Sequence, residues 1–370
     1  MPPLTRSSAN EIPALHGLRA LAIAMILIFH FWLAFRDLMP PLSAFVGNFL
    51  WHFSISVTLF FVMSAQLISA SLLREYERNG RISIPRFMLS RALRIFPAYY
   101  FFVLLALGLL MLQRSRIMQA GGADPISGWY FDFFYVSNYF RGIQAHTWTL
   151  SIEEQFYLVF PFLTLFLFRL KRSTLTVVLT LLYLIPLVCR AWMLYNTPRE
   201  YFNEHVDLFL HTRFDDLVAG LFITLVIKQP EARKTRAIIA VVSFALILAP
   251  MILVDQEQPL WYLVIRPNMI NIGFAGFVLL ALGLKSFEVG RIVTALARLS
   301  YSIYLWHMVA GIFAAGIILR GIKPGEHLSW LTTFKAFALS LFITVLFGLF
   351  SYYAIERPFL KLKERLARPR

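Results

Sequence analysis

The stretch Leu15–Phe35 reads LHGLRALAIAMILIFHFWLAF and decides the fold class. About 20 apolar residues in a helix suffice to cross a bilayer, and this stretch has that length. It carries two ionisable side chains, Arg19 and His30, which lie about 16 Å apart along a helix at 1.5 Å per residue. Because an ionisable group inside a span is unfavourable, we interpret both as functional candidates. The alternative is that Arg19 reaches a lipid headgroup and that His30 bonds to a neighbouring helix.

The composition excludes an ordinary soluble protein. Of the 370 residues, 59% are hydrophobic and 15% are charged, against about 25% charged residues in soluble domains. The net charge of +15 would suggest a nucleic-acid ligand in a soluble protein. Here the charge is confined to short loops between apolar runs, so membrane topology and anionic lipids explain it better. We therefore expect membrane lipids, and no nucleic acid, among the partners.

The apolar runs predict an all-α membrane protein, a polytopic bundle of about ten transmembrane helices in a single domain over residues 1–370. We expect the third span to begin earlier than its apolar run, inside an arginine-rich segment. The expected spans are Leu15–Phe35, Phe45–Ala70, Pro97–Leu112, Leu150–Phe168, Leu175–Tyr195, Leu208–Ile227, Ile238–Leu253, Met269–Leu284, Ala295–Leu319 and Leu331–Tyr353.

Basic residues gather in alternate loops, which predicts the orientation of the chain. With ten spans, five basic loops fall on the side of the N-terminus, so the positive-inside bias places both termini in the cytoplasm. The longest loop, Gln113 to Thr147, is then on the outer side. Its glycines and aromatic residues are compatible with a segment that folds back into the bundle or with a simple linker.

Polar residues in the second and third spans form the next candidates. Ser64 and Gln66 lie inside the second span, where helix–helix hydrogen bonding is the simpler role for each. Arg91 and Arg94 are three residues apart and therefore share a helix face. Two guanidiniums on one face can hold phosphates, although loop arginines also set topology. Pro97 then predicts a kink or a break at the membrane edge.

The fourth span begins HTWTLSIEEQFYLVFP, with Glu153 and Glu154 near its outer start. Trp148 and Tyr157 suit an interfacial position, and helix capping would explain one acidic residue. Two consecutive acids point about 100° apart on a helix, so at least one faces the bundle interior. A buried cation or imidazole could pair with it there.

Three further features lie in the later spans. Arg213 and Asp216 are three apart, which favours a structural ion pair. His307 is a second imidazole in an apolar span, for which a hydrogen-bonded core histidine is the simpler interpretation. Pro358 is expected to end the tenth span. No pattern for a metal site, a phosphate-binding loop or a serine-hydrolase elbow is found.

Seven segments, in order, resemble the motifs of the membrane acyltransferase family called acyltransferase 3. No single segment is specific for this family, but the occurrence of all seven in the same order is. The first contains Arg19 and His30 separated by ten residues, and the central acid of the fourth falls on Glu153. The segments are HGLRALAIAMILIFH, TLFFVMSAQLIS, SRALRIFPAYY, WTLSIEEQFYLVFP, TRFDDLVAG, LSYSIYLWH and IERPF.

The chain departs from the family pattern at Ala65-Gln66, where a Gly-Phe pair is usual, and at Thr149, where Ser is usual. The first departure is expected to reshape the acyl or acceptor cavity. The chain shows no fused hydrolase-like domain of the kind some relatives carry, so the resemblance implies a stand-alone integral enzyme.

The resemblance implies transfer of an acyl group, commonly acetyl, from acyl-coenzyme A to a hydroxyl, usually of a sugar or glycoconjugate. His30 is then the expected general base, with Glu153 as the carboxylate that orients it. Arg19 is expected at the catalytic site or on the coenzyme, and Arg91 and Arg94 on its phosphates. Substrate contacts are expected from Ser64, Gln66, Trp148, Tyr157 and His307, and no metal is expected.

A second class of function fits the same composition. A transporter or flippase of a lipid-linked saccharide would also need many spans with buried His, Glu and Arg. The basic face before the third span favours the enzyme, because a carrier has no need to hold coenzyme phosphates. A structural scaffold would leave the buried polar groups unexplained.

Overall fold

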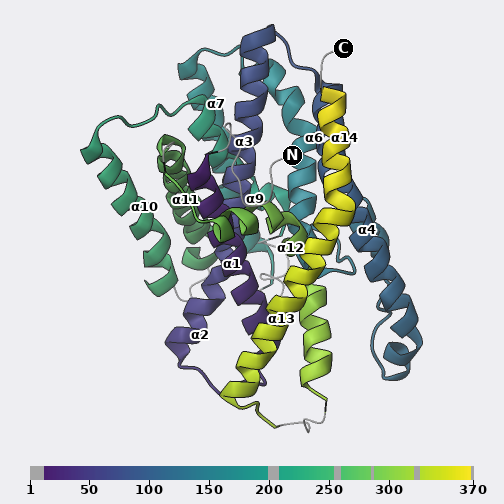
Figure 1. Ribbon diagram of the computed structural model, residues 1–370. Helices are drawn as coiled ribbons and strands as arrows, with labels where there is room; N and C mark the ends of the chain where they lie inside the picture. Colours follow the sequence, from purple (N-terminus) through teal and green to yellow (C-terminus); the bar gives the residue numbers. More distant parts are fainter. Residues whose placement is uncertain (1–11, 199–207, 254–259, 285–286, 321–325, 368–370) are drawn as a thin grey trace.

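A computed structural model describes residues 12–198, 208–253, 260–284, 287–320 and 326–367, which form a bundle of helices with no β-strand in these ranges (Figure 1). Within them, nine helical segments are long and apolar enough to cross a membrane. The main helices are α1 (Pro13–Phe35), α2 (Ala44–Trp51), α3 (Ser56–Asn79), α4 (Ile84–Gln119), α5 (Trp129–Phe133), α6 (Trp148–Leu167), α7 (Arg172–Asn196), α9 (Leu210–Leu225), α10 (Arg233–Leu253), α11 (Arg266–Gly283), α12 (Arg291–Ile318), α13 (Trp330–Phe350) and α14 (Arg357–Ala367).

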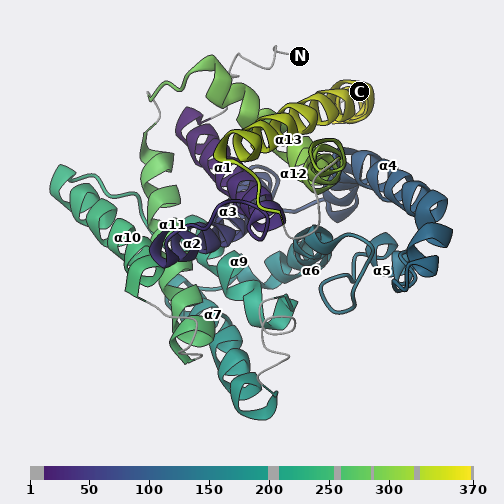
Figure 2. The same ribbon diagram turned by 90° about the horizontal axis from the view of Figure 1, so that it is seen from below.

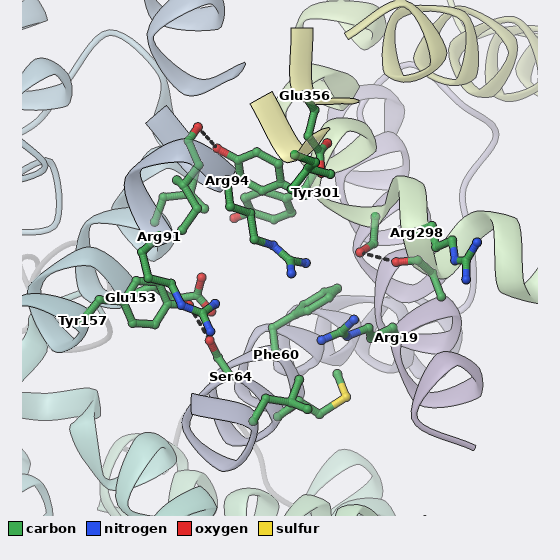
Figure 3. A pocket seen from close by; sticks show the side chains of 18 of the residues that line it. Arg19, Phe60, Ser64, Arg91, Arg94, Glu153, Tyr157, Arg298, Tyr301 and Glu356 are labelled. Carbon is green, nitrogen blue, oxygen red and sulfur yellow. Dashed lines mark hydrogen bonds between the residues drawn. The ribbon is translucent and has the colours of Figure 1, made fainter. Parts of the chain in front are cut away.

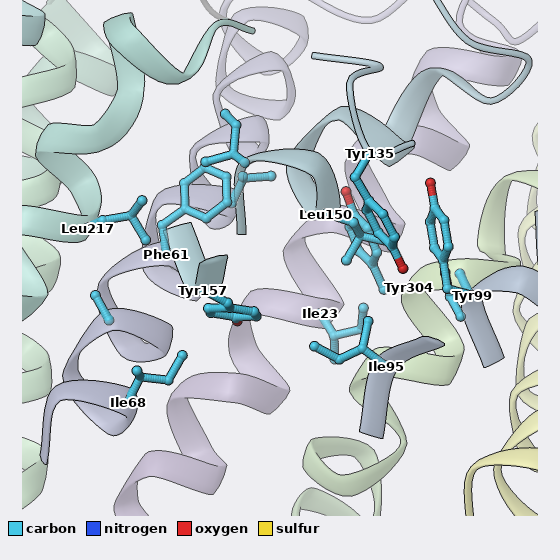
Figure 4. Close-up of a cluster of buried hydrophobic side chains, with 14 of the residues drawn as sticks. Ile23, Phe61, Ile68, Ile95, Tyr99, Tyr135, Leu150, Tyr157, Leu217 and Tyr304 are labelled. Carbon is cyan, nitrogen blue, oxygen red and sulfur yellow. The ribbon is translucent and has the colours of Figure 1, made fainter. Parts of the chain in front are cut away.

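The centre of the bundle is built on α1, which packs against both α3 and α12, while α3 packs against α9. Seen from below, α10 and α4 lie at opposite edges with α1 and α3 between them (Figure 2). Large apolar side chains of α3, α4, α6 and α12 fill the interior (Figure 4). Outward-facing residues are also apolar, as on α10, where Val241 is 68% exposed. Such a surface suits contact with lipid.

Local sequence signals fix several helix ends. Pro13 stands in the first turn of α1, where its missing N–H costs no hydrogen bond. Gly80 ends α3 with φ of 65°, a left-handed conformation that glycine adopts without steric cost. The Ser329 side chain caps α13 by accepting a hydrogen bond from the Thr332 amide at 3.1 Å. Most spans lie within a few residues of the predicted bounds, but two differ. The expected span Phe45–Ala70 is divided between α2 and α3 and ends at Asn79, and α4 extends beyond the expected Pro97–Leu112 at both ends.

The expected sixth span is the exception to the predicted count. It corresponds to α9, whose 16 residues measure about 24 Å, shorter than a typical hydrocarbon core of about 30 Å. Gly220 lets α9 approach α3 closely, because a Cβ there would lie 2.4 Å from the Val62 carbonyl oxygen. The helix is buried among its neighbours, so ten apolar runs give nine membrane-length segments in the described ranges. The cytoplasmic placement of both termini stays a prediction.

Two prolines stand within helical segments. Pro97 lies inside α4, which runs unbroken for 36 residues, so of the expected kink or break the break does not occur. The third span does begin in the arginine-rich segment, at Ile84. Pro358 does not end the last span, because it stands in the first turn of α14, where a proline is tolerated. A π-helical turn, Ser351–Glu356, joins α13 to α14.

The segment 120–147 folds back against the bundle. Asp132 is fully buried and accepts hydrogen bonds from the Ile143 amide at 2.6 Å and from the Thr147 hydroxyl. Burial raises the pKa of this carboxyl, and those hydrogen bonds oppose the shift. Gly142 permits the approach, because a Cβ there would lie 2.3 Å from an Asp132 carboxylate oxygen. The segment thereby delivers His146 to the bundle interior.

Candidate functional site

A cavity of about 600 Å³ lies between α1, α3, α4, α6 and α12 and is bordered by α14 (Figure 3). On α3 its lining runs from Val57 to Arg74, which corresponds to about 25 Å of helix at 1.5 Å per residue. Arg74 is exposed, whereas Val57 is buried, so the cavity extends from the surface into the bundle.

The lining of this cavity is strongly cationic. Six basic and three acidic side chains face it, a formal excess of three positive charges. Within the described part of the chain, Arg19, Arg91 and Arg94 have no carboxylate within 4.0 Å. Uncompensated cations inside a bundle are unfavourable unless a ligand neutralises them. The basic residues are Arg19, Arg74, Arg91, Arg94, Arg298 and Lys363, and the acids are Glu153, Glu356 and Glu364.

Aromatic faces hold the Arg91 side chain. Its guanidinium carbon lies 5.5 Å from the ring centroid of Phe87 and 5.5 Å from that of Tyr157. Its Nε is buried and makes no hydrogen bond within the described residues. Cation–π contacts fix a guanidinium without occupying its N–H groups. The Arg91 guanidinium is therefore held in place while its Nε–H stays available to a ligand.

Glu153, Ser64 and Tyr157 form a polar group on the same cavity. The Ser64 hydroxyl is hydrogen-bonded to the Tyr157 hydroxyl. Glu153 lies close to both and within electrostatic reach of Arg91 and Arg94. Five of the residues singled out from the sequence thus meet with Arg19 around one space, as Figure 3 shows.

Thr149 and Tyr304 form the part of the cavity wall next to His146 and His307. Their hydroxyl oxygens are 2.6 Å apart, and the Tyr304 hydroxyl also donates to the His146 carbonyl at 3.0 Å. Tyr304 has neighbours on both sides, because it lines the cavity while its ring centroid lies 5.4 Å from that of His307. The lining does not include His30, His146 or His307.

His30 and His307 are direct neighbours behind this wall. Nε2 of His307 lies 3.2 Å from Nδ1 of His30, and the two ring centroids are 4.7 Å apart. His146 packs edge-on against His307 at 5.0 Å between centroids. His307 is fully buried, whereas His30 is partly exposed. The expected contact between His30 and Glu153 is not among the contacts of either residue.

Backbone carbonyls assign the protons of this neutral pair. Nδ1 of His307 lies 2.6 Å from the Tyr304 carbonyl, which can only accept a hydrogen bond. Nδ1 of His307 therefore carries the proton, and its Nε2 is bare, that is, unprotonated with a free lone pair. Nδ1 of His30 lies 3.0 Å from the Ile26 carbonyl and must likewise carry its proton. It shares that proton between Ile26 and His307. Nε2 of His30 is then bare, and it has no partner in the described residues.

Besides His307, two other predicted substrate contacts lie away from the cavity. Gln66 is buried beside α9, where its backbone carbonyl accepts from Thr224 at 3.2 Å. Trp148 packs against Phe61, with Arg213 5.9 Å from its ring centroid. The predicted ion pair between Arg213 and Asp216 is confirmed at 3.1 Å. Gln66 and Trp148 therefore occupy helix–helix contacts in this structure.

Sequence reasoning missed three residues that the fold adds. Lys363 and Arg298 complete the basic lining, and His146 joins the histidine cluster. In the sequence, Lys363 belongs to a basic tail whose charges indicate only the membrane orientation of the chain. Its place on the cavity depends on how α14 packs against α4, which the sequence does not show. His146 precedes Trp148 by two residues, but nothing in the spacing relates it to His307.

Comparison with known proteins decides the family. The model of an acyltransferase domain matches residues 12–352, nearly the whole chain. The chain belongs to the acyltransferase 3 family. The match confirms the family resemblance; it contains the first six motifs and every cavity residue up to Tyr352, whereas IERPF lies beyond its end.

Two bacterial proteins named as O-acetyltransferases are also similar to the chain. O-acetyltransferase OatA of Staphylococcus aureus (strain NCTC 8325 / PS 47) is 26% identical over 96% of this chain and 58% of its own length. Peptidoglycan O-acetyltransferase OatA of Listeria monocytogenes is 28% identical over 82% of the chain and 50% of its own length. The chain thus spans about half the length of these relatives. No solved structure matches.

Proposed function

We propose that the protein is a membrane O-acetyltransferase of the bacterial inner membrane that moves an acetyl group from acetyl-coenzyme A to a hydroxyl of a glycan. One observation carries this proposal. Tyr304 lines the cation-rich cavity, its ring centroid lies 5.4 Å from that of His307, and His307 contacts His30, whose Nε2 is unprotonated. The cavity suits the donor, and the imidazole suits activation of the acceptor.

The charge of the cavity supports a polyanionic donor. Coenzyme A carries a diphosphate and a ribose phosphate, and guanidinium groups bind phosphate oxygens through paired N–H donors. Arg91 and Arg94 would hold these phosphates together with Lys363, and Arg19 would contact a phosphate or a carbonyl of the pantetheine arm. In the absence of donor, Glu153 balances part of the charge of Arg91 and Arg94. The thioester would then point toward Thr149 and Tyr304.

The arrangement of His30 supports its role as general base. A base must present a lone pair to the hydroxyl that it deprotonates, and the hydrogen bonds of Nδ1 leave that lone pair on Nε2. The acceptor oxygen attacks the thioester carbonyl while its proton moves to Nε2. The carbon–sulfur bond breaks, and the thiolate of coenzyme A finally receives that proton. The products are an O-acetylated acceptor and free coenzyme A.

The names of the relatives support a glycan acceptor. One similar protein is named for peptidoglycan, and its match covers 82% of this chain. The hydroxyl that accepts the acetyl group is therefore expected in a cell-wall sugar or a related saccharide. The alternative function, a transporter or flippase of a lipid-linked saccharide, is less well supported. The matched family is one of acyltransferases, and the cations line one cavity.

Binding and transfer assays on purified protein in nanodiscs would test the proposal. We expect radiolabelled acetyl-coenzyme A to bind and to transfer its acetyl group to soluble glycan fragments. Free acetate serves as the control, because it lacks the phosphates. Transport of a lipid-linked saccharide without any binding of acetyl-coenzyme A would contradict the proposal and favour the carrier.

A further inference from the structure

The partner of His30 is a second imidazole, and no carboxylate of the described residues contacts either ring. In many hydrolases a carboxylate stabilises the imidazolium that forms when the base takes a proton. Here that contact is absent, and an apolar environment makes an isolated cation unfavourable. The charge that develops on His30 must be stabilised in another way.

The proton assignments give His307 a suitable atom for this task. Its bare Nε2 faces the Nδ1–H of His30 at 3.2 Å, and its own Nδ1–H is fixed on the Tyr304 carbonyl at 2.6 Å. His307 can therefore accept a second proton without rotating, and the resulting cation keeps its hydrogen bond to Tyr304. Because His307 is fully buried between α1 and its own helix, its ring cannot turn freely toward solvent.

We propose that His30 and His307 act as an imidazole pair in which His307 receives the Nδ1 proton of His30 as the acceptor proton arrives at Nε2. The proton count balances. The acceptor hydroxyl loses one proton to Nε2 of His30, and His30 passes one from Nδ1 to Nε2 of His307. When the carbon–sulfur bond breaks, both transfers reverse and the thiolate of coenzyme A takes the proton. His307 is thus a positioning and relay residue that does not touch substrate.

This inference rests on the assignment of His30 as the base, which is part of the proposed function. It differs from a purely orienting role for His307, because the Ile26 carbonyl already holds the Nδ1 proton of His30. It also differs from simple packing, which an aromatic ring without nitrogen would satisfy. Two variants separate these roles. Gln at position 307 can accept a hydrogen bond but not a proton, and Phe can do neither.

The experiment measures single-turnover acetyl transfer by the full-length protein in nanodiscs, in mixtures of H₂O and D₂O. For the parent protein we expect a bowed dependence of rate on deuterium fraction, which indicates two protons in motion. We expect His307→Gln to lower the rate about 10-fold or more and to make the dependence linear. The dissociation constant of acetyl-coenzyme A should change less than about 3-fold. His307→Phe should be at least as slow as His307→Gln.

His52→Gln is the matched control, because His52 is also fully buried and its Nδ1 also donates to a carbonyl, that of Asn48 at 2.7 Å. It lies outside the histidine cluster, so its rate should stay within about 3-fold of the parent. A His307→Gln variant with the parent rate, or a linear dependence in the parent protein, would overturn the relay. If His30→Ala itself keeps full activity, the base assignment fails instead, and the two failures are distinguishable.

Discussion

The cavity and the histidine cluster differ in almost every property, although Thr149 and Tyr304 border both. The cavity is rich in positive charge that its own acids do not neutralise. The cluster holds three imidazoles, and no carboxylate in the described part of the chain forms an ion pair with them. In the proposed function, the first region attracts a polyanionic donor and the second exchanges a proton. Donor binding and acceptor activation would then depend on different groups, so mutations should separate them.

His30→Ala should give the largest effect of any single change. Removing a general base typically costs about 10²- to 10⁴-fold in rate, because no other group with a bare nitrogen replaces it at this position. The affinity for acetyl-coenzyme A should stay within about 3-fold of the parent, since His30 does not line the cavity. Transfer assays and equilibrium binding on the same nanodisc preparation check both numbers. A parallel loss of donor affinity would break the separation between the two regions.

The double variant Arg91→Ala/Arg94→Ala should show the opposite pattern. Each guanidinium lost from a phosphate removes about 1.5–3 kcal/mol of charged hydrogen bonding, so donor affinity should fall at least 10-fold. The transfer rate at saturating donor should fall much less. Arg86→Ala is the control, because Arg86 lies on the same helix and does not line the cavity. Unchanged donor affinity in the double variant would remove the phosphate role.

Gly220→Val tests the scaffold that both regions share. A side chain at position 220 would meet the Val62 carbonyl and the Cβ of Ala65, so α3 and α9 would be forced apart. Overpacking of this kind costs about 1–3 kcal/mol of folding free energy. Binding and transfer should fall together, with a lower melting temperature in detergent. Gly108→Val is the matched control, since nothing lies within 4 Å of a Cβ there.

Lys363→Gln should have the smallest effect on donor binding. Lys363 is one cation among six around the cavity and stands near its edge on α14, so we expect a 3- to 10-fold rise in the KM for acetyl-coenzyme A. Lys361→Gln on the same helix should leave the KM unchanged, because Lys361 is exposed and does not line the cavity. Equal effects of the two variants would mean that α14 acts only through its general charge.

Much of this arrangement could be predicted from the sequence because membrane helices leave strong local signals. The apolar runs gave the helical bundle, and the spacing of Arg91 and Arg94 put both on one face of α4. Nine of the expected spans reach membrane length in the described residues, whereas α9 has 16 residues and is buried, a difference that hydropathy does not predict. The bulk of the architecture therefore follows from hydropathy and helix geometry.

The pairing of side chains between helices could not be predicted in the same way. Depth along the helices suggested Glu153 as the partner of His30, but depth does not determine which faces of two helices meet. The contact between α1 and α12 brings His307 to His30, while Glu153 turns toward Ser64, Tyr157 and the arginines. The position of Lys363 on the cavity depends on the continuation of the helix past Pro358 into α14. These contacts belong to tertiary structure.

An experimental structure of the His30→Ala variant with bound acetyl-coenzyme A would test the central claim most directly. The account predicts that the phosphates lie against Arg91 and Arg94 and that the thioester reaches the wall at Thr149 and Tyr304, facing the histidine cluster. A coenzyme bound elsewhere, or with its thioester directed away from that wall, would contradict it.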